Sequence, residues 1–425
     1  KAGYGPSEQL GQSLDEEQGP RLVFAGATQS IYLSDLSGDG LTDLTRIRNG
    51  EICYWPNLGY GRFGAKVTMD HSPLLDAWDD FDPSRVRLVD VDGSGAVDII
   101  YLNRDHARVY FNHAGNSWRA AVPLPQLPPV DNLASVQALD LLGTGTACLV
   151  WSSSLPGDHE HSLRYIDLMA GQKPHLLVGV TNNLGAETRI EYTPSTKFYV
   201  RDRDAGLPWL TRVPFPVHVV ERVIVYDHIS RSRFTTRYAY HHGYFDGEER
   251  EFRGFGMVEQ WDAESYGALE ADGLLPGADN LSADTHLPPV LTKTWFHTGL
   301  YQDGERISNH YAFTDGADAY WHEPGQRYDE TRASLLLNTI LPEGLTVGEE
   351  REAVRALKGS MLRQEVYALD DSERATTPYT VTEQNYTVRC LQHRGDNRHA
   401  VFFTHPRESI SRHYERNPSD PRTSH

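Results

Sequence analysis

Two short acidic turns carry the side chains best suited to chemistry in this sequence. In each turn, oxygen-bearing residues occupy positions 1, 3, 5, 7 and 9, and position 7 offers its backbone carbonyl. The first turn comprises Asp35, Ser37, Asp39, Leu41 and Asp43, and the second comprises Asp90, Asp92, Ser94, Ala96 and Asp98. Alternate side chains in a tight loop turn toward one centre, and hard oxygen ligands at this density suit Ca²⁺. We therefore predict a structural Ca²⁺ ion in each turn and no other cofactor.

The glycines and the charges of these turns favour this prediction, but a second interpretation stays open. Glycines such as Gly38 and Gly40 permit the sharp backbone path. Three carboxylates in one loop repel one another unless a cation lies between them. The alternative is an Asp-Gly turn whose side chains bond only to backbone amides.

A third copy of the turn begins at Asp140 but has lost its ligands. Leu142 stands where the second ligand is expected, and Cys148 stands in place of the last aspartate. We expect no hard ion there, so this copy must hold by packing alone. The predicted metals are therefore structural, since a catalytic ion needs an open coordination place and an acid–base partner.

The turns belong to a longer repeat. The first aspartate recurs 55 and then 50 residues along the chain. Downstream positions keep the same frame in the first two copies: Asn57 matches Asn112, Phe63 matches Trp118, and Val67 matches Val122. Each copy contains short strands, for example residues 44–48 and 51–55 around the hairpin turn Asn49–Gly50. A unit of about 50 residues with three or four strands has the size of a propeller blade. A run of hairpins in a β-sandwich is the alternative.

The rest of the chain is predicted to be mainly β. Loops or turns are expected at residues 193–197, 241–247 and 250–256, and a helix is expected at 349–357, ended by Gly359. Residues 262–288 are acidic, contain Gly and Pro, and lack periodicity, which is typical of a linker. Strands are expected within residues 176–190, 213–226, 233–240 and 290–298, and in several stretches after 364.

Charge and composition exclude several classes of protein. The 40 Lys and Arg residues against 59 Asp and Glu residues give a net charge of −19, which disfavours nucleic-acid binding and docking onto anionic membranes. No run of 18 apolar residues is present, and the first residues do not form a signal peptide. Cys53, Cys148 and Cys390 are odd in number and far apart, so they form neither a disulfide framework nor a C-x-x-C site.

The sequence contains no recognisable catalytic motif. It lacks a P-loop, a G-x-S-x-G elbow and a dinucleotide-binding fingerprint. The acidic stretch from Asp76 to Asp82 is interpreted as a solvated loop rather than a catalytic carboxylate pair. Four histidines match no zinc spacing and are expected in turn and cross-strand roles: His218, His228, His241 and His242. No catalytic residue is therefore predicted.

Several long stretches resemble one protein family. They are RIRNGEICYWPNLGYGRFG at residues 46–64, TACLVWS at 146–152, YAYHHGYFDGEEREFRGFG at 238–256 and ALKGSMLRQEVY at 356–367. These stretches resemble the B component of bacterial insecticidal toxin complexes (Tc toxins), and the likeness extends over about residues 20 to 425. The ends of the chain are interpreted as cuts in a longer polypeptide.

The resemblance implies a mainly β fold with integrin-like (FG-GAP/VCBS) β-propeller blades, followed by a β-rich middle region that begins an Rhs-type shell. In such proteins the propeller docks onto the pore-forming A component as a gate, and the shell encloses a toxic C-terminal payload. The implied domains are a tail or junction (1–20), a partial propeller (21–157), a middle/N-terminal β domain (158–262), a linker (263–289) and a middle/C-terminal region that starts the shell (290–425).

The sequence thus predicts a secreted, non-enzymatic scaffold and docking part of a Tc toxin B component. Its predicted partners are the pore-forming A component and the C component with its payload, without nucleic acid and without direct membrane insertion. Two alternatives stay open at this point: a calcium-stabilised propeller adhesin or carbohydrate-binding module, and a propeller hydrolase.

Overall fold

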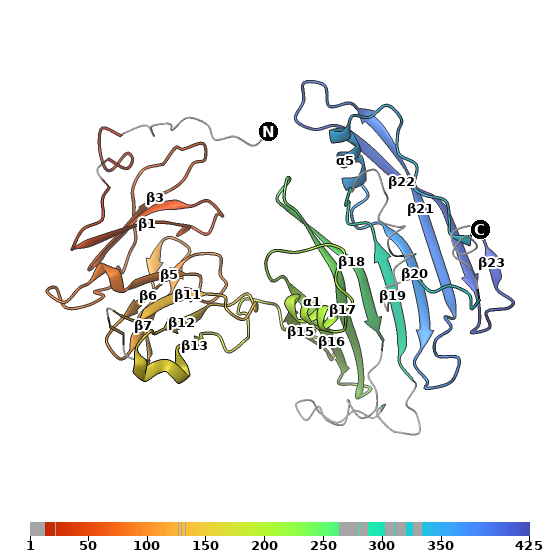
Figure 1. The fold of residues 1–425 in the computed structure, drawn as a ribbon, viewed down its shortest axis with the longest axis horizontal. Coiled ribbons are helices and arrows are strands. Elements are labelled where there is room, and N and C mark those ends of the chain that lie inside the picture. The colour runs from red at the N-terminus through yellow and green to blue at the C-terminus, as the bar shows by residue number, and fades with distance from the viewer. Residues whose placement is uncertain are drawn as a thin grey trace. The chain divides into compact units, whose positions relative to one another are not determined.

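The described residues of the computed structural model fall into two compact units (Figure 1). Unit 1 ends at Leu176 and unit 2 begins at Leu177. The structure describes residues 13–21, 23–125, 127–128, 130–131, 133–262, 280, 288–301, 311, 320–325 and 334–425. Most of the predicted tail (1–20) and linker (263–289) lies outside these residues, and the finer domain division stays a prediction. Within the described residues, no helix has the length and apolar character that crossing a bilayer requires.

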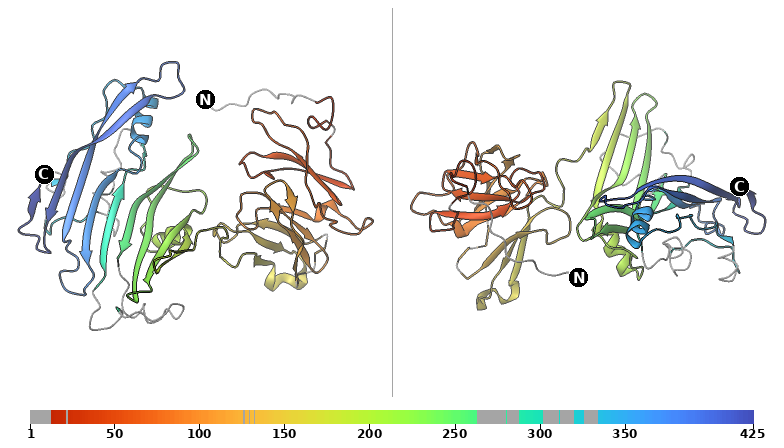
Figure 2. Two further views of the ribbon diagram at one scale, coloured as in Figure 1. Left: turned by 180° about the vertical axis from the view of Figure 1, so that it is seen from behind. Right: turned by 90° about the horizontal axis from the view of Figure 1, so that it is seen from above.

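Unit 1 is built from small antiparallel sheets (Figures 1 and 2). Two sheets have four strands, in the orders β1–β2–β3–β4 and β5–β6–β7–β10, a third has the order β11–β12–β13, and β8 pairs with β9. The strands are β1 (Gln29–Ser34), β2 (Asp43–Arg48), β3 (Glu51–Trp55), β4 (Val67–Thr68), β5 (Val86–Val89), β6 (Asp98–Leu102), β7 (Ala107–Tyr110), β8 (Asn112–His113), β9 (Ser117–Trp118), β10 (Val122–Leu124), β11 (Ser135–Leu139), β12 (Cys148–Ser152) and β13 (Leu163–Asp167). The predicted mainly β character is confirmed.

The sequence repeat reappears in the pairing register of the strands. The residue before each turn pairs with the last residue of the turn or its replacement, as Ser34 with Asp43, Val89 with Asp98, and Leu139 with Cys148. The downstream match is also structural, since Asn57 bridges to Phe63 just as Asn112 pairs with Trp118. The copies are therefore equivalent pieces of structure.

Strand β6 connects two hydrophobic cores. Its five residues are all buried, and successive side chains in a strand point to opposite faces. Ile99 and Tyr101 join the core shared with the first sheet, whereas Ile100 and Leu102 join the core shared with the third. The unbroken apolar run of this strand is the pattern expected when both faces are covered.

Unit 2 is a ten-stranded antiparallel sheet in which each strand pairs with its neighbours in the chain (Figure 1). The strands are β14 (Gly179–Thr181), β15 (Ala186–Pro194), β16 (His218–Asp227), β17 (Ser232–Asp246), β18 (Glu251–Trp261), β19 (Val290–Phe296), β20 (Met361–Ala368), β21 (Thr380–Gln392), β22 (Val401–His413) and β23 (Arg422–Ser424). The two edge strands, β14 and β23, are short, with three residues each.

The turns predicted at residues 241–247 and 250–256 are wrong, because most of both stretches lies in β17 and β18. The glycines that suggested turns form an irregularity instead: the register shifts between Gly243 and Phe245, and Gly254 has a positive φ of 91°. A bulge uses the same backbone freedom as a turn. The actual reversal is confined to residues 247–250.

The loop predicted at residues 193–197 is also wrong, because helix α1 (Thr196–Asp204) begins within it. The helix has few apolar residues, and Phe198 and Asp202 are the two buried ones. Its polar sequence hides the helical period. The helix is instead fixed by tertiary contacts, since Ser195 Oγ accepts a hydrogen bond from Val217 N at 3.1 Å.

The predicted helix at residues 349–357 is confirmed as α5 (Val347–Arg355). It begins with a capping box, in which Thr346 Oγ1 accepts from Glu349 N (3.3 Å) and Glu349 Oε2 accepts from Thr346 N (2.9 Å). These bonds satisfy amides that have no partner inside the first helical turn.

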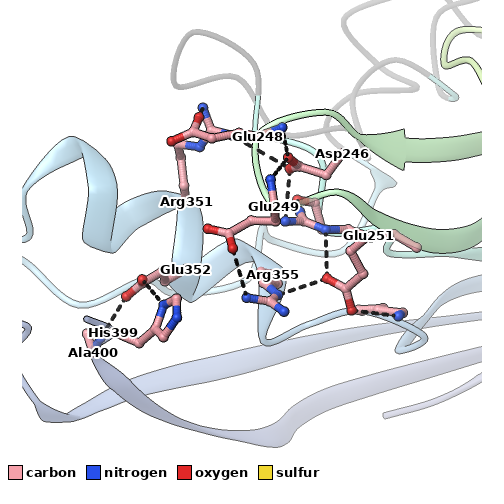
Figure 3. A network of polar contacts seen from close by, with 12 residues as sticks. Asp246, Glu248, Glu249, Glu251, Arg351, Glu352, Arg355, His399 and Ala400 are labelled. Carbon is pink, nitrogen blue, oxygen red and sulfur yellow. Dashed lines mark hydrogen bonds and ion pairs between the residues drawn. The ribbon is translucent and has the colours of Figure 1, made fainter. Parts of the chain in front are cut away.

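Helix α5 also joins two hairpins of the sheet (Figure 3). Toward the β17–β18 turn, Arg351 Nη1 lies 2.6 Å from Glu248 Oε2, and Arg355 Nε lies 2.9 Å from Glu251 Oε2. Toward the β21–β22 hairpin, the carboxylate of Glu352 accepts from Ala400 N at 2.7 Å. The helix thus links strands that are not neighbours in the sheet.

Asp246 is the buried centre of the first of these contacts. Its Oδ2 lies 2.9 Å from Arg253 Nη2, and both side chains are almost fully buried. Its Oδ1 accepts from the backbone N–H groups of Glu248 and Glu249 at 3.0 Å each. One carboxylate therefore shapes the hairpin turn and neutralises a buried guanidinium.

Asp246→Ala should destabilise unit 2 far more than Glu248→Ala. The first change removes the closest carboxylate from buried Arg253, which costs about 3 kcal/mol or more. The second removes an exposed partner of Arg351, which costs at most about 1 kcal/mol. Urea unfolding of both variants checks this, and equal destabilisation would contradict the assignment of Asp246 as the buried centre.

Candidate metal centre

The two acidic turns connect the first and second strands of the first two sheets. The first turn lies between β1 and β2, and the second between β5 and β6. Asp43 and Asp98 are the first residues of β2 and β6 and are fully buried. The side chains of the other predicted ligands lie in the turn itself, nearer to solvent.

The second turn gathers three carboxylates. Asp90, Asp92 and Asp98 each offer a ligand oxygen, and these atoms lie within 4.8 Å of one another. Backbone amides hold two of them in place: Ser94 N donates to Asp90 Oδ1 (3.0 Å) and Asp92 Oδ1 (3.1 Å). Ser94 Oγ lies 3.5 Å from the Ala96 carbonyl. This oxygen set fits the predicted Ca²⁺ ion.

Asp98 has a structural role whether or not an ion is present. Its Oδ2 accepts from Val91 N and its Oδ1 from Asn112 N, at 2.8 Å each. Burial raises the pKa of Asp98 to about 7, although these backbone hydrogen bonds act in the opposite direction. A bound cation would favour the ionised form of this carboxylate.

The first turn uses its carboxylates mainly on backbone amides. Asp43 accepts from Leu36 N (3.1 Å) and Asn57 N (3.0 Å), in parallel with Asp98. Asp35 accepts from Gly38 N (2.7 Å) and from Gly40 N (2.8 Å). Asp39 accepts from Leu41 N (2.8 Å), and Ser37 Oγ donates to Asp35 Oδ1 (3.3 Å). Among the described residues, the three carboxylates of this turn do not form a group as tight as that of the second turn.

The turns also contact each other, which the sequence did not indicate. Val97 N donates to the Asp35 carbonyl at 3.0 Å, and Asn112 Nδ2 donates to the Leu36 carbonyl at 2.9 Å. Hydrogen bonds from the second repeat therefore stabilise the turn of the first repeat. An ion in one turn would stiffen a contact shared by both.

The third turn keeps its shape without the missing ligands. Asp140 accepts from Thr144 N (3.0 Å) and from Gly145 N (2.8 Å), as Asp90 does with Ser94 and Gly95. Cys148 is fully buried. The third turn thus forms around its first aspartate without the two missing ligands, so an ion in the other turns would add stability to a backbone path that already forms.

A basic segment near the end of unit 1 covers the second turn. His175 Nε2 lies 3.2 Å from Asp92 Oδ2, and the Lys173 side chain lies so close to Gly93 that a Cβ there would be 2.7 Å from it. These residues are 83 and 80 positions away from their partners, so local sequence patterns could not reveal them.

The histidines considered for zinc do not gather into a metal site within the described part of the chain. His228 directly follows β16, and its Nε2 lies 3.1 Å from Glu187 Oε2 of β15. His241 is buried, with Nδ1 2.7 Å from Asp202 Oδ2 of α1 and Nε2 3.3 Å from Glu259 Oε2 of β18. Burial alone lowers the pKa of His241, but the hydrogen bonds and charges of these two carboxylates raise it to about 9.

Comparison with known proteins places the chain in a family. Residues 119–272 match the model for the middle/N-terminal region of the insecticide toxin TcdB, and residues 352–425 match the model for its middle/C-terminal region. One similar structure is the crystal structure of TcdB2-TccC3-Cdc42, whose matching chain has 31% sequence identity to this chain and a TM-score of 0.78. The match covers 94% of this chain and 18% of that chain. The chain belongs to the family of Tc toxin B components. A crystal structure of TcdB2-TccC3 gives the same TM-score at 30% identity, with the same shares of the two chains covered.

A Tc holotoxin pore from Photorhabdus luminescens is also similar to this chain. The identity is 32% and the TM-score 0.77, and the match covers 94% of this chain and 18% of that chain. No curated protein sequence matches the chain. The chain spans about a fifth of the length of the solved proteins it matches, at 18%.

Calcium should raise the melting temperature through the second turn. In Asp92→Asn the difference in melting temperature between calcium and chelator should become smaller. The melting temperature in chelator should stay within about 2 °C of that of the unmodified chain, because Asp92 is not one of the fully buried carboxylates. Asp98→Ala should lower melting by about 5 °C or more in both conditions, because two amides lose their acceptor. Differential scanning calorimetry measures both. Asp140→Asn is the matched control in the third turn, and it should leave the effect of calcium on the melting temperature unchanged. An unmodified chain with the same melting temperature in calcium and in chelator would contradict the metal site.

Alkaline pH should weaken unit 2 through His241. Since the folded pKa of about 9 exceeds the ordinary value of 6.5, the stabilisation is complete below about pH 6.5 and is lost as the pH rises through about 9. The contribution of protonated His241 to the free energy of unfolding is at most about 3 kcal/mol. Urea unfolding between about pH 7 and pH 10 should show this loss in the unmodified chain and a flatter profile in His241→Gln. Parallel profiles would contradict the role of His241.

Proposed function

We propose that this chain is a non-enzymatic scaffold and docking part of a Tc toxin B component. The observation that carries the proposal is the match of 94% of the chain to TcdB2-TccC3 structures at a TM-score of 0.78. The acidic surface and the lack of a sequence motif for catalysis agree with a structural role.

Unit 1 is proposed to be a set of integrin-like (FG-GAP/VCBS) blades from a β-propeller. Its support is the shared pairing register of successive sheets and the way β6 serves the cores on both sides. Small sheets that stack through shared cores are the building units of a β-propeller. In this proposal the propeller docks onto the pore-forming A component and acts as a gate.

Calcium is proposed as a structural cofactor of the two acidic turns. The second turn supports this with three carboxylates within 4.8 Å. The first turn shares the spacing of ligands and contacts the second through Val97 and Asn112. Ions there would hold adjoining sheets rigid, so that a partner surface can be presented in one shape.

Unit 2 is proposed to begin an Rhs-type shell around the toxic C-terminal payload. A wide antiparallel sheet with long strands, fastened at its hairpins by α5, suits a wall that must not bend. The proposed partners are the pore-forming A component and the C component, and the proposed location is outside the producing cell.

Binding to the A component tests the proposal. The chain and a purified Tc pore-forming component are mixed in calcium buffer and separated by size-exclusion chromatography. We expect co-elution of the folded chain with the pore-forming component. The same measurement is made with the chain grafted in place of the matching 18% of a TcdB2-type protein, which supplies the surrounding structure. A folded graft that stays apart from the pore-forming component would contradict the docking role.

A further inference from the structure

The acidic stretch between β4 and β5 holds two exposed apolar side chains in a rigid loop. In this segment, which we call the Trp78 loop (residues 73–82), Trp78 is 73% exposed and Leu74 is 56% exposed. Leu75, between them, is fully buried. Trp78 and Leu74 are thus two large apolar side chains that one loop presents to solvent.

The loop is fixed by the hairpin turn Asn49–Gly50. Asn49 is almost fully buried, and its Oδ1 accepts from Leu75 N at 2.7 Å while its Nδ2 donates to the Asp76 carbonyl at 2.8 Å. Gly50 N donates to the Pro73 carbonyl at 3.0 Å. Arg108 adds a hydrogen bond to the Leu75 carbonyl. Hydrogen bonds from two neighbouring segments therefore hold the backbone of this half of the loop in place.

The second half of the loop is anchored as well. The backbone N–H groups of Asp80 and Phe81 both donate to the Ala77 carbonyl at 3.1 Å. The Phe81 ring stacks on Tyr101, with centroids 6.0 Å apart and planes 18° apart. Trp78 thus projects from a turn whose two sides are both packed against the sheet.

Leu74 and Trp78 form one apolar patch over Gly50. A Cβ at Gly50 would lie 3.2 Å from Leu74 Cδ2 and 3.8 Å from Trp78 Cη2. The positive φ of 79° at Gly50 suits the hairpin turn, and the missing side chain leaves room for both residues. The two side chains are therefore neighbours and can enter one pocket together.

The patch carries negative charge beside the apolar side chains. Asp79 and Asp80 are exposed, and neither forms an ion pair with any described residue. Asp82, by contrast, lies 3.6 Å from Arg85 and caps the short helix that follows (Pro83–Arg85). The unpaired carboxylates thus lie directly beside Trp78 in the sequence.

We infer that the Trp78 loop is a docking element, which inserts Trp78 and Leu74 into an apolar pocket bordered by Lys and Arg side chains on a protein partner. This inference rests on the proposed function, which identifies the partner as the pore-forming A component. Tryptophan in a desolvated pocket is a frequent binding hot spot, and a rigid loop lowers the entropy lost on association. The acidic rim would guide encounter with the basic border.

The charge of the loop argues against other occupants. Asp79 and Asp80 repel phosphate-rich surfaces, so nucleic acid and anionic lipid fit poorly. A second copy of the chain related by a two-fold axis would bring the same carboxylates toward each other. The net charge of −19 adds to that repulsion.

Binding kinetics to the A component test the inference. Trp78→Ala should weaken binding by about 30-fold, mainly through faster dissociation. The double variant Asp79→Asn, Asp80→Asn should slow association at low salt, and this difference should vanish in about 0.5 M NaCl. Tyr60→Ala is the matched control, since Tyr60 is 98% exposed and lies outside the loop, and it should bind like the unmodified chain.

The outcomes separate the two proposals. Unchanged melting temperatures establish that each variant is folded, which we expect because Trp78 is exposed. Binding of Trp78→Ala within about threefold of the unmodified chain overturns the docking role of the loop and leaves the proposed function intact. An unmodified chain and graft that bind no A component overturn the proposed function, and this inference with it.

Discussion

Buried carboxylates that accept backbone N–H groups determine the shape of unit 1. Asp43 and Asp98 lie at the start of the second strand in the first two sheets, fully buried, and each closes its turn onto the strand pair and onto an asparagine amide 14 residues further on. Burying a charge is costly unless strong hydrogen bonds compensate it. The same two residues therefore fix the turns and connect them to the next hairpin.

Unit 2 uses the same principle with side chains as partners. Asp246 pairs with Arg253, His241 lies between Asp202 and Glu259, and Arg363 lies between Glu365 and Glu383 at 2.6 and 2.9 Å. These pairs occupy interior positions that apolar side chains fill in most sheets. They occur in a chain with only 39% hydrophobic residues and a mean hydropathy of −0.52. Ion pairs demand specific geometry, so they favour a defined register over slipped alternatives.

Local patterns were enough to predict part of this molecule. The hairpin around Asn49–Gly50 and helix α5 follow from turn and capping chemistry, and the acidic turns follow from residue spacing. The bulge at Gly243, the helix after Ser195 and the covering of Asp92 by His175 were missed, because each depends on residues far away in the chain. Glycine permits backbone conformations that occur in both turns and bulges. Whether a turn or a β-bulge forms depends on the pairing with the neighbouring strand. For the candidate site, spacing identified the three carboxylates that the second turn brings together, whereas the contact between the two turns needed the fold.

The sharing of β6 between two cores has a mechanical consequence. Ile99 and Tyr101 support one neighbour while Ile100 and Leu102 support the other, so no outer sheet of unit 1 can detach without exposing one face of this strand. Unfolding of either outer sheet therefore destabilises the middle sheet. The three sheets should unfold as one cooperative unit, even though most of their strand pairing is local.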